Sequence, residues 1–265
     1  MAALAPPLRV VIVEHMLLEA TPATAASIDH PAVRALLAEL HRRARGDLLR
    51  LPAKLPRVAL DLLRGRTLMQ SFGDGAAKDL FLTISPEQGR FLYLVGRTVA
   101  ARRVVEFGTS FGVSTLYLAA AVTDNGGGRV IGSELEPGKH EVAVENLARA
   151  GFDAVAEVRL GDAMTTLADV EGPIDLVLLD GWKDLYLPML RLLRPKLRRG
   201  SVVLADNIFT FKKSLRPFLD YLRSPENGFQ STTLSISDGF EYSVYVGPSL
   251  KAPSTEAAPS SDLGG

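Results

Sequence analysis

Polar side chains follow two apolar stretches in the second half of this 265-residue sequence. The first stretch runs into Asp180 and, three residues later, Lys183; the second runs into Asp206 and Asn207. Carboxylate and amide oxygens beside an amine are groups that bind a polar ligand. Buried strands that end in such groups are typical of a ligand site at the carboxyl edge of an open α/β sheet. We therefore expect these four side chains to converge at such an edge.

The elements that would position these groups follow an alternating pattern. The run Leu176–Leu179 is apolar without alternation, which favours a central parallel strand covered on both faces. The alternation predicts an α/β fold: a doubly wound, seven-stranded, mostly parallel sheet with a terminal antiparallel hairpin and a helical N-terminal extension. The parallel strands are expected at residues 103–107, 129–134, 156–160, 174–179 and 201–205, with the hairpin at 231–237 and 241–247.

The N-terminal extension, residues 1–80, is expected to form a lid or a dimer contact, with plain packing as the alternative. Amphipathic helices are predicted over residues 31–45 and 55–68, separated by a loop near Pro52 and Pro56.

Residues 81–248 are expected to form the main domain. Its first helix is predicted to begin after Ser85, an N-cap residue, with Pro86 in the first turn. Further helices are predicted over residues 164–170, 187–197 and 212–222. Residues 249–265 have no periodicity, which predicts a disordered tail.

Composition excludes several classes of function. Thirty acidic and thirty basic residues cancel, so the chain has no bulk field for nucleic acid or an anionic membrane. The absence of cysteine excludes disulfides and thiolate metal sites, and four scattered histidines disfavour a zinc site. No apolar run is long enough to span a membrane, which favours a cytoplasmic protein, and the Ala- and Arg-rich composition is typical of a high-GC bacterium.

A glycine-bearing turn follows the first predicted strand. Gly108 permits a tight turn and a close approach to a ligand, and Gly112 opens the next helix. Counted from Gly108, a dinucleotide turn would need two further glycines where Ser110 and Val113 stand, so a pyrophosphate is disfavoured. Glu106, just before the turn, favours a cationic or neutral ligand.

Acidic residues also end the next two strands. Glu134 can accept both hydroxyls of a ribose, and Asp162 can meet an adenine edge. Acids at three consecutive strand ends indicate a nucleoside that carries positive charge and no phosphate, and S-adenosylmethionine fits that description.

The sequence at this point resembles a known family, the class I S-adenosylmethionine-dependent methyltransferases, and more narrowly the magnesium-dependent catechol O-methyltransferases. The resemblance covers about residues 80–247 and is most specific at Leu-Asp-Gly-Trp-Lys-Asp-Leu-Tyr-Leu-Pro (179–188) and Val-Leu-Ala-Asp-Asn (203–207). Val-Glu-Phe-Gly (105–108), Ser-Glu-Leu-Glu-Pro (133–137) and Ser-Asp-Gly-Phe-Glu (237–241) fit the same family.

The resemblance implies roles for the matching residues. Asp180, Asp206 and Asn207 would hold Mg²⁺ or another divalent cation, and Lys183 would be the catalytic base. Together with the residues of the turn and the strand ends, the expected cofactor-binding set is Leu82, Ile84, Glu106, Gly108, Ser110, Gly112, Ser114, Glu134, Asp162, Ala163, Asp180 and Trp182.

Two positions depart from the animal enzymes of that family. Gly181 stands where they carry histidine, and Thr232 aligns with the carboxylate that contacts their substrate hydroxyl. The metal ligands and the base carry over, whereas that substrate contact does not.

We therefore expect a magnesium-dependent O-methyltransferase that acts on a small molecule with vicinal hydroxyls, a catechol or a phenol. Three protein oxygens leave three positions of an octahedral Mg²⁺ for two substrate oxygens and one water, and Lys183 would accept the hydroxyl proton. Two alternatives stay open: methylation of a sugar or another non-aromatic hydroxyl, and a non-catalytic S-adenosylmethionine-binding or scaffold protein.

Overall fold

A computed structural model of the chain describes residues 26–66 and 83–247. The strands are β1 (Arg103–Phe107), β2 (Arg129–Glu134), β3 (Ala156–Leu160), β4 (Ile174–Leu179), β5 (Leu197–Ala205), β6 (Phe229–Leu234) and β7 (Phe240–Tyr245). They form one sheet in the order β3-β2-β1-β4-β5-β7-β6. Strands β1 to β5 pair in parallel, and β7 runs antiparallel to β5 and β6. The predicted doubly wound sheet with a terminal hairpin is confirmed.

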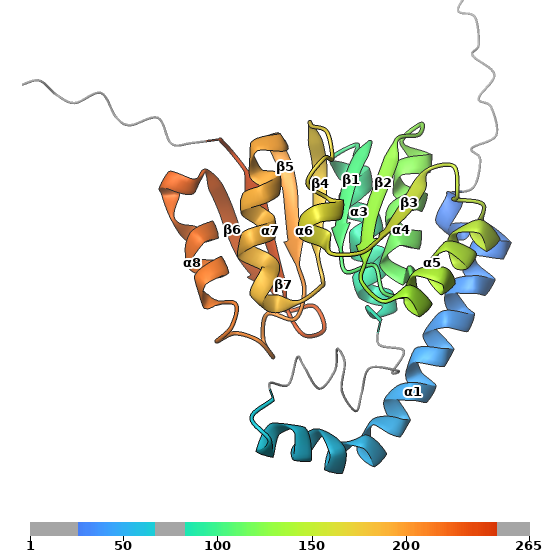
Figure 1. Ribbon diagram of the computed structural model, residues 1–265. Coiled ribbons are helices and arrows are strands. Elements are labelled where there is room, and N and C mark those ends of the chain that lie inside the picture. Colours follow the sequence, from blue (N-terminus) through green and yellow to red (C-terminus); the bar gives the residue numbers. More distant parts are fainter. Residues whose placement is uncertain (1–25, 67–82, 248–265) are drawn as a thin grey trace, which may run out of the picture.

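Helices cover both faces of the sheet. Figure 1 shows α6, α7 and α8 on one face, and α3 and α4 on the other. The helices are α1 (Pro31–Leu63), α3 (Pro86–Thr98), α4 (Val113–Asp124), α5 (Pro137–Ala150), α6 (Ala163–Thr166), α7 (Tyr186–Leu193) and α8 (Arg216–Arg223). Short 3₁₀ turns lie at η1 (Ser27–Asp29), η2 (Lys183–Leu185), η3 (Arg194–Lys196) and η4 (Pro225–Asn227).

Strand β4 lies in the middle of the sheet and is buried on both faces. Leu176 and Leu178 belong to the apolar cluster that includes residues of α3 and α4, whereas Val177 and Leu179 belong to the cluster that includes residues of α7 and α8. Each of the four residues is 0% exposed. Burial on both sides thus explains the apolar run without alternation in the sequence. The strand ends at Leu179, so Asp180 lies at the carboxyl edge of the sheet.

One predicted loop is wrong: the residues around Pro52 and Pro56 continue a single helix, α1. Each proline lacks an N–H and disfavours the preceding helical turn. Figure 1 shows that α1 bends between its blue and teal halves, and such a bend accommodates the prolines without ending the helix.

Three other helices are shorter than predicted. The stretch 164–170 forms only the four-residue α6 (Ala163–Thr166), the helix predicted over 187–197 is α7, which ends at Leu193, and the helix predicted over 212–222 begins at Arg216. Pro217 explains the last difference, because proline is favoured in the first turn of a helix.

The first half of α1 is fixed to the domain. Val33, Leu37 and Leu40 are buried in the same cluster as residues of α3, α4 and α5. Arg149 of α5 donates to Glu39 with an Nη2–Oε2 distance of 2.7 Å. This half of α1 therefore has a defined place beside the sheet.

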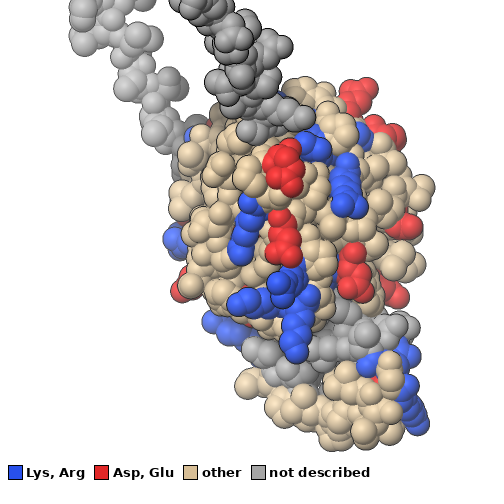
Figure 2. Space-filling view, turned by 90° about the vertical axis from the view of Figure 1, so that its left-hand side faces the viewer, with Lys and Arg blue, Asp and Glu red and all other residues tan. Residues whose placement is uncertain are grey.

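The surface carries mixed charge on the side seen in Figure 2, where acidic and basic side chains are interleaved rather than sorted into broad areas of one sign. In the described ranges, no helix is both long and apolar enough to cross a membrane.

Candidate active site

The carboxyl ends of β1, β4 and β5 are held side by side by backbone hydrogen bonds. The N–H of Asp180 donates to the carbonyl of Phe107 at 2.8 Å, and the N–H of Asp206 donates to the carbonyl of Leu179 at 3.0 Å. The parallel pairing thus continues past the strands into the polar turns. The expected convergence of Asp180 and Asp206 follows from this register.

The two carboxyls lie in a desolvated environment. Asp206 is 4% exposed, and the Asp180 side chain is 19% exposed. Burial, together with the negative charge of Asp180, raises the pKa of Asp206 to about 8. Burial also raises the pKa of Asp180, and the Lys183 ammonium opposes that shift. Two such carboxyls are costly to ionise together unless a cation lies between them.

Asn207 completes the expected oxygen set. Its φ is 63°, the left-handed conformation that asparagine adopts more readily than most residues. Its carbonyl accepts from the N–H of Phe211 at 3.2 Å, which fixes the turn after β5. Among the described residues, no group of three or more His, Cys, Asp or Glu side chains forms a metal site. The donor set of two carboxylates and one amide nevertheless suits Mg²⁺, which prefers oxygen ligands and few protein carboxylates.

Lys183 is buried, in contrast to an ordinary surface lysine. It is 5% exposed, and its Nζ donates to the Tyr186 hydroxyl at 2.7 Å and lies 3.4 Å from Asp180 Oδ1. The Tyr186 hydroxyl in turn donates to the Asp206 carbonyl at 3.2 Å. Tyr186 was missed in the sequence analysis, although its spacing from Lys183, one helical turn, would have indicated the contact.

A second missed residue, Gln88, orients Asp206. Its Nε2 donates to Asp206 Oδ1 at 2.8 Å, and its Oε1 accepts from the Ser85 N–H at 2.8 Å. Gln88 is 3% exposed. The Ser-x-x-Gln spacing predicts a capping box at the start of α3, which the structure contains. The contact to Asp206 is a tertiary interaction that no local pattern encodes.

Glu106 lies under the glycine turn and is 0% exposed. The Thr109 and Thr115 hydroxyls donate to its Oε2 at 3.0 and 2.5 Å, and both threonines were missed in the sequence analysis. Its Oε1 has no hydrogen-bond partner in the described part of the chain. Burial raises the pKa of Glu106 to about 7, against the opposing effect of nearby hydroxyls, including that of Ser114. A buried carboxyl oxygen without a partner fits a cationic group of a ligand at this turn.

The glycine turn packs directly on the Asp180 turn. A β-carbon on Gly108 would lie 2.5 Å from the Gly181 nitrogen, and φ at Gly108 is +94°. A β-carbon on Gly181 would lie 2.5 Å from the Phe107 ring. Glycine at both positions therefore lets the two turns touch. The departure at Gly181 is accounted for by the Phe107 ring, which fills the space of a side chain.

Glu134 holds the glycine turn from the neighbouring strand. Its Oε2 accepts from the Ser110 N–H at 2.7 Å, and its Oε1 accepts from the Glu136 N–H at 2.9 Å. Ser110 has a φ of 51° and Gly112 a φ of 80°, so with Gly108 the turn contains three residues of positive φ. The Glu134 carboxylate therefore stabilises the strained turn, and its oxygens retain lone pairs for a ligand.

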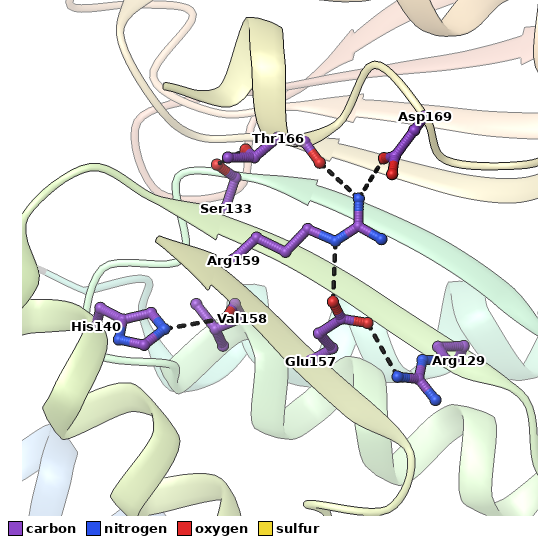
Figure 3. A network of polar contacts seen from close by, with 8 residues as sticks. All are labelled: Arg129, Ser133, His140, Glu157, Val158, Arg159, Thr166 and Asp169. Carbon is purple, nitrogen blue, oxygen red and sulfur yellow. Dashed lines mark hydrogen bonds and ion pairs between the residues drawn. The ribbon is translucent and has the colours of Figure 1, made fainter. Parts of the chain in front are cut away.

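The next strand end is fixed by a polar network on β3 (Figure 3). Arg159 donates to the Thr166 carbonyl at 2.6 Å, and the Ser133 and Thr166 hydroxyls are 2.7 Å apart. These contacts attach α6 to the sheet. Asp162, exposed, caps α6 by accepting from the Met164 N–H at 2.9 Å, and Ala163 is buried behind it.

Of the remaining predicted cofactor-binding residues, two lie near the site and one lies outside the described residues. Ile84 is buried at the start of α3, and Trp182 is half-buried against the α7 side of the core. Leu82 lies outside the described residues, as does the predicted tail at 249–265. A cavity of about 310 Å³ adjoins the site, and its lining includes Asp206 and Asn207.

Comparisons with known proteins agree with this fold. The family described as "Methyltransferase domain" matches residues 105–208. The catechol O-methyltransferase of Mycobacterium tuberculosis (strain ATCC 25618 / H37Rv) is 39% identical over 128 residues, which are 48% of this chain and 57% of that protein. The chain thus spans less than two thirds of this curated relative.

Solved structures are similar over a larger share of both chains. The cofactor-bound Rv0187 from MTB has a TM-score of 0.58 and 31% identity, covering 62% of this chain and 82% of that one. The O-methyltransferase from Bacillus cereus in complex with SAH has a TM-score of 0.57 and 26% identity at the same coverage. The sheet order and these matches define a Rossmann-like methyltransferase domain. The chain belongs to the class I S-adenosylmethionine-dependent methyltransferases.

Proposed function

We propose that this protein is a magnesium-dependent O-methyltransferase that transfers a methyl group from S-adenosylmethionine to a hydroxyl of a small molecule with vicinal hydroxyls, a catechol or a phenol. One observation carries the proposal: Asp180, Asp206 and the buried Lys183 meet at adjacent strand ends. The glycine turn, next to the unpartnered Glu106 oxygen, packs against the turn that carries Asp180.

The residues of the chain would divide the work as follows. Asp180, Asp206 and Asn207 would hold the divalent ion and leave positions for two substrate oxygens. Lys183 would remove the proton from the hydroxyl that reacts, with its Nζ held by the Tyr186 hydroxyl. When bound, the ion stabilises an ionised hydroxyl and the cofactor supplies an electrophilic methyl group. The remaining contribution of the protein is alignment of the two reactants.

The cofactor would lie across the glycine turn. The free Glu106 oxygen would accept from its amino group, and Glu134 would accept from its ribose hydroxyls. Ile84, Trp182 and Ala163 would border its apolar parts.

A substrate panel tests the proposal as a whole. Methyl transfer from labelled S-adenosylmethionine is measured with vicinal diols on aromatic rings, with monohydroxyl analogues and with glycosides, each with Mg²⁺ or with excess chelator. We expect transfer to aromatic vicinal diols only when Mg²⁺ is present. Equal transfer in chelator, or transfer confined to the glycosides, would contradict the metal or the substrate assignment respectively.

Cofactor affinity is expected to rise with pH through the titration of Glu106. Its pKa of about 7 means that the carboxyl is mostly neutral at pH 6 and mostly ionised at pH 8. Because an ionised carboxylate binds an ammonium more tightly, S-adenosylhomocysteine should bind about fivefold more tightly at pH 8 than at pH 6. Calorimetry of the wild type and Glu106→Gln measures this slope. The variant should lose it, and an identical slope in both proteins would remove Glu106 from cofactor recognition.

Replacing Glu134 by alanine is expected to weaken S-adenosylhomocysteine binding by about tenfold or more, because the turn loses the acceptor of the Ser110 N–H and the ligand loses a hydroxyl acceptor. Glu171→Ala is the matched control, since Glu171 is an exposed acid before β4, at the opposite edge of the sheet. Unaltered affinity in Glu134→Ala by calorimetry would refute this role.

A further inference from the structure

The cavity beside the metal-binding residues reaches helix α1. Its volume of about 310 Å³ lies at the lower end of the range of roughly 300–1,000 Å³ for small-molecule pockets. Asp206, Asn207 and Gln88 line it from the sheet side, and His41, Ala44 and Arg45 line it from α1. A molecule whose hydroxyls lie at Asp206 would therefore extend toward α1.

Asp206 lies in the wall of this cavity that the sheet contributes, and Arg45 lies in the wall that α1 contributes. Arg45 is exposed and pairs with no acidic side chain in the ranges that the structure describes. An arginine without an acidic partner at the wall of a binding cavity is available to an anionic group of a ligand.

The other polar residue on this wall adds no positive charge. His41 is 7% exposed, and its Nε2 lies 3.0 Å from the Tyr117 hydroxyl. Burial, together with the nearby Arg45 charge, lowers the pKa of His41, so its imidazole is neutral at neutral pH. The positive charge of the wall thus belongs to Arg45.

The α1 wall is fixed relative to the sheet, so the separation of Arg45 from Asp206 is set by the fold. Val33, Leu37 and Leu40 bury one side of α1 in the core, and the Glu39–Arg149 ion pair joins α1 to α5. Ala44 and, from the start of α3, Pro86 also line the cavity and give it apolar surface that suits an aromatic ring.

We propose that Arg45 selects substrates that carry a carboxylate on the side of the ring opposite the vicinal hydroxyls. The inference rests on the proposed function, since it takes the hydroxyl end of the substrate to lie at Asp206 and Asn207. A carboxylate on a short side chain matches the small volume and the planar, two-donor geometry of a guanidinium. The substrate class is thus an acidic vicinal dihydroxyaromatic compound.

Equilibrium binding tests this independently of turnover. Trp182, the single tryptophan, lies next to the site and reports ligand binding by its fluorescence. Three ligands with the same diol are titrated in the presence of Mg²⁺ and S-adenosylhomocysteine: 3,4-dihydroxyphenylacetate, the neutral 3,4-dihydroxyphenylethanol and the cationic dopamine. The wild type should bind the anionic ligand most tightly and the cationic ligand most weakly.

The Arg45→Gln variant should lower the ratio of anionic to neutral affinity by about tenfold, the lower end for a charge-assisted hydrogen bond at an exposed residue. Arg42→Gln is the control, because Arg42 is an exposed arginine of the same helix outside the cavity lining, and it should keep the wild-type ratio. An unchanged ratio in Arg45→Gln, or a wild type that prefers dopamine, would overturn the proposal.

Methyl transfer to the same ligands distinguishes a failure of the role of Arg45 from a failure of the proposed function. If the neutral diol is methylated and the Arg45→Gln ratio equals that of the wild type, the function stands and the role of Arg45 fails. If none of the three diols is methylated, the proposed function fails, and the binding ratio still decides whether Arg45 recognises the carboxylate.

Discussion

Replacing Asp206 by alanine is expected to lower magnesium-dependent turnover by at least about a hundredfold, the loss that removal of several kcal/mol of charge stabilisation produces. Asp206 is one of two carboxylates available to the ion, and its side chain is almost fully buried. The glycine turn and Glu106 belong to another strand end, so affinity for S-adenosylhomocysteine should be retained. Methyl transfer and manganese binding, the latter followed by electron paramagnetic resonance, measure the two effects separately.

The control for this change is Asp206→Asn. Alanine leaves Gln88 Nε2 without its acceptor, which costs about 1–3 kcal/mol of folding stability. Asparagine keeps an acceptor oxygen of the same shape and removes only the charge. Weak manganese binding in both variants, with normal melting of Asp206→Asn, supports the metal role. Full turnover of the wild type in excess chelator would remove the metal from the mechanism.

Replacing Lys183 is expected to reduce kcat by about 10²–10⁴-fold, the usual contribution of a positioned general base. Methionine in its place keeps the unbranched shape and most of the length of the buried side chain and removes the amine. Binding of S-adenosylhomocysteine and of manganese should persist, because neither ligand requires the Lys183 amine. Single-turnover methyl transfer measures the chemical step directly.

Lys183→Arg separates a proton acceptor from a fixed positive charge. An arginine keeps the charge beside Asp180 but does not give up its proton at accessible pH. Low activity in both variants is the expected result. Near wild-type activity in Lys183→Arg would show that the charge alone matters, and near wild-type activity in Lys183→Met would remove Lys183 from catalysis.

The position of several site residues follows from local sequence patterns, and the sequence alone determined that part of the site. A continuous apolar run predicts a buried parallel strand, and the residue after such a strand lies at the carboxyl edge of the sheet. Asp180 and Asp206 each occupy this position, and Glu106 lies one residue before the end of β1. The period of strands and helices therefore predicted the sheet and the edge at which the three acids lie.

The tertiary structure decided what those acids touch. Gln88 contacts Asp206 from a residue separation of 118, and His41 meets Tyr117 from a separation of 76. Local periodicity carries no information about such pairs, because they depend on how helices pack against the finished sheet. The continuity of α1 through Pro52 and Pro56 is of the same kind, since packing of its first half stabilises a helix that local propensity disfavours. The sequence thus determined the edge of the sheet where the site lies, whereas only the packing of α1 and α3 against that edge placed Arg45 and Gln88 beside it.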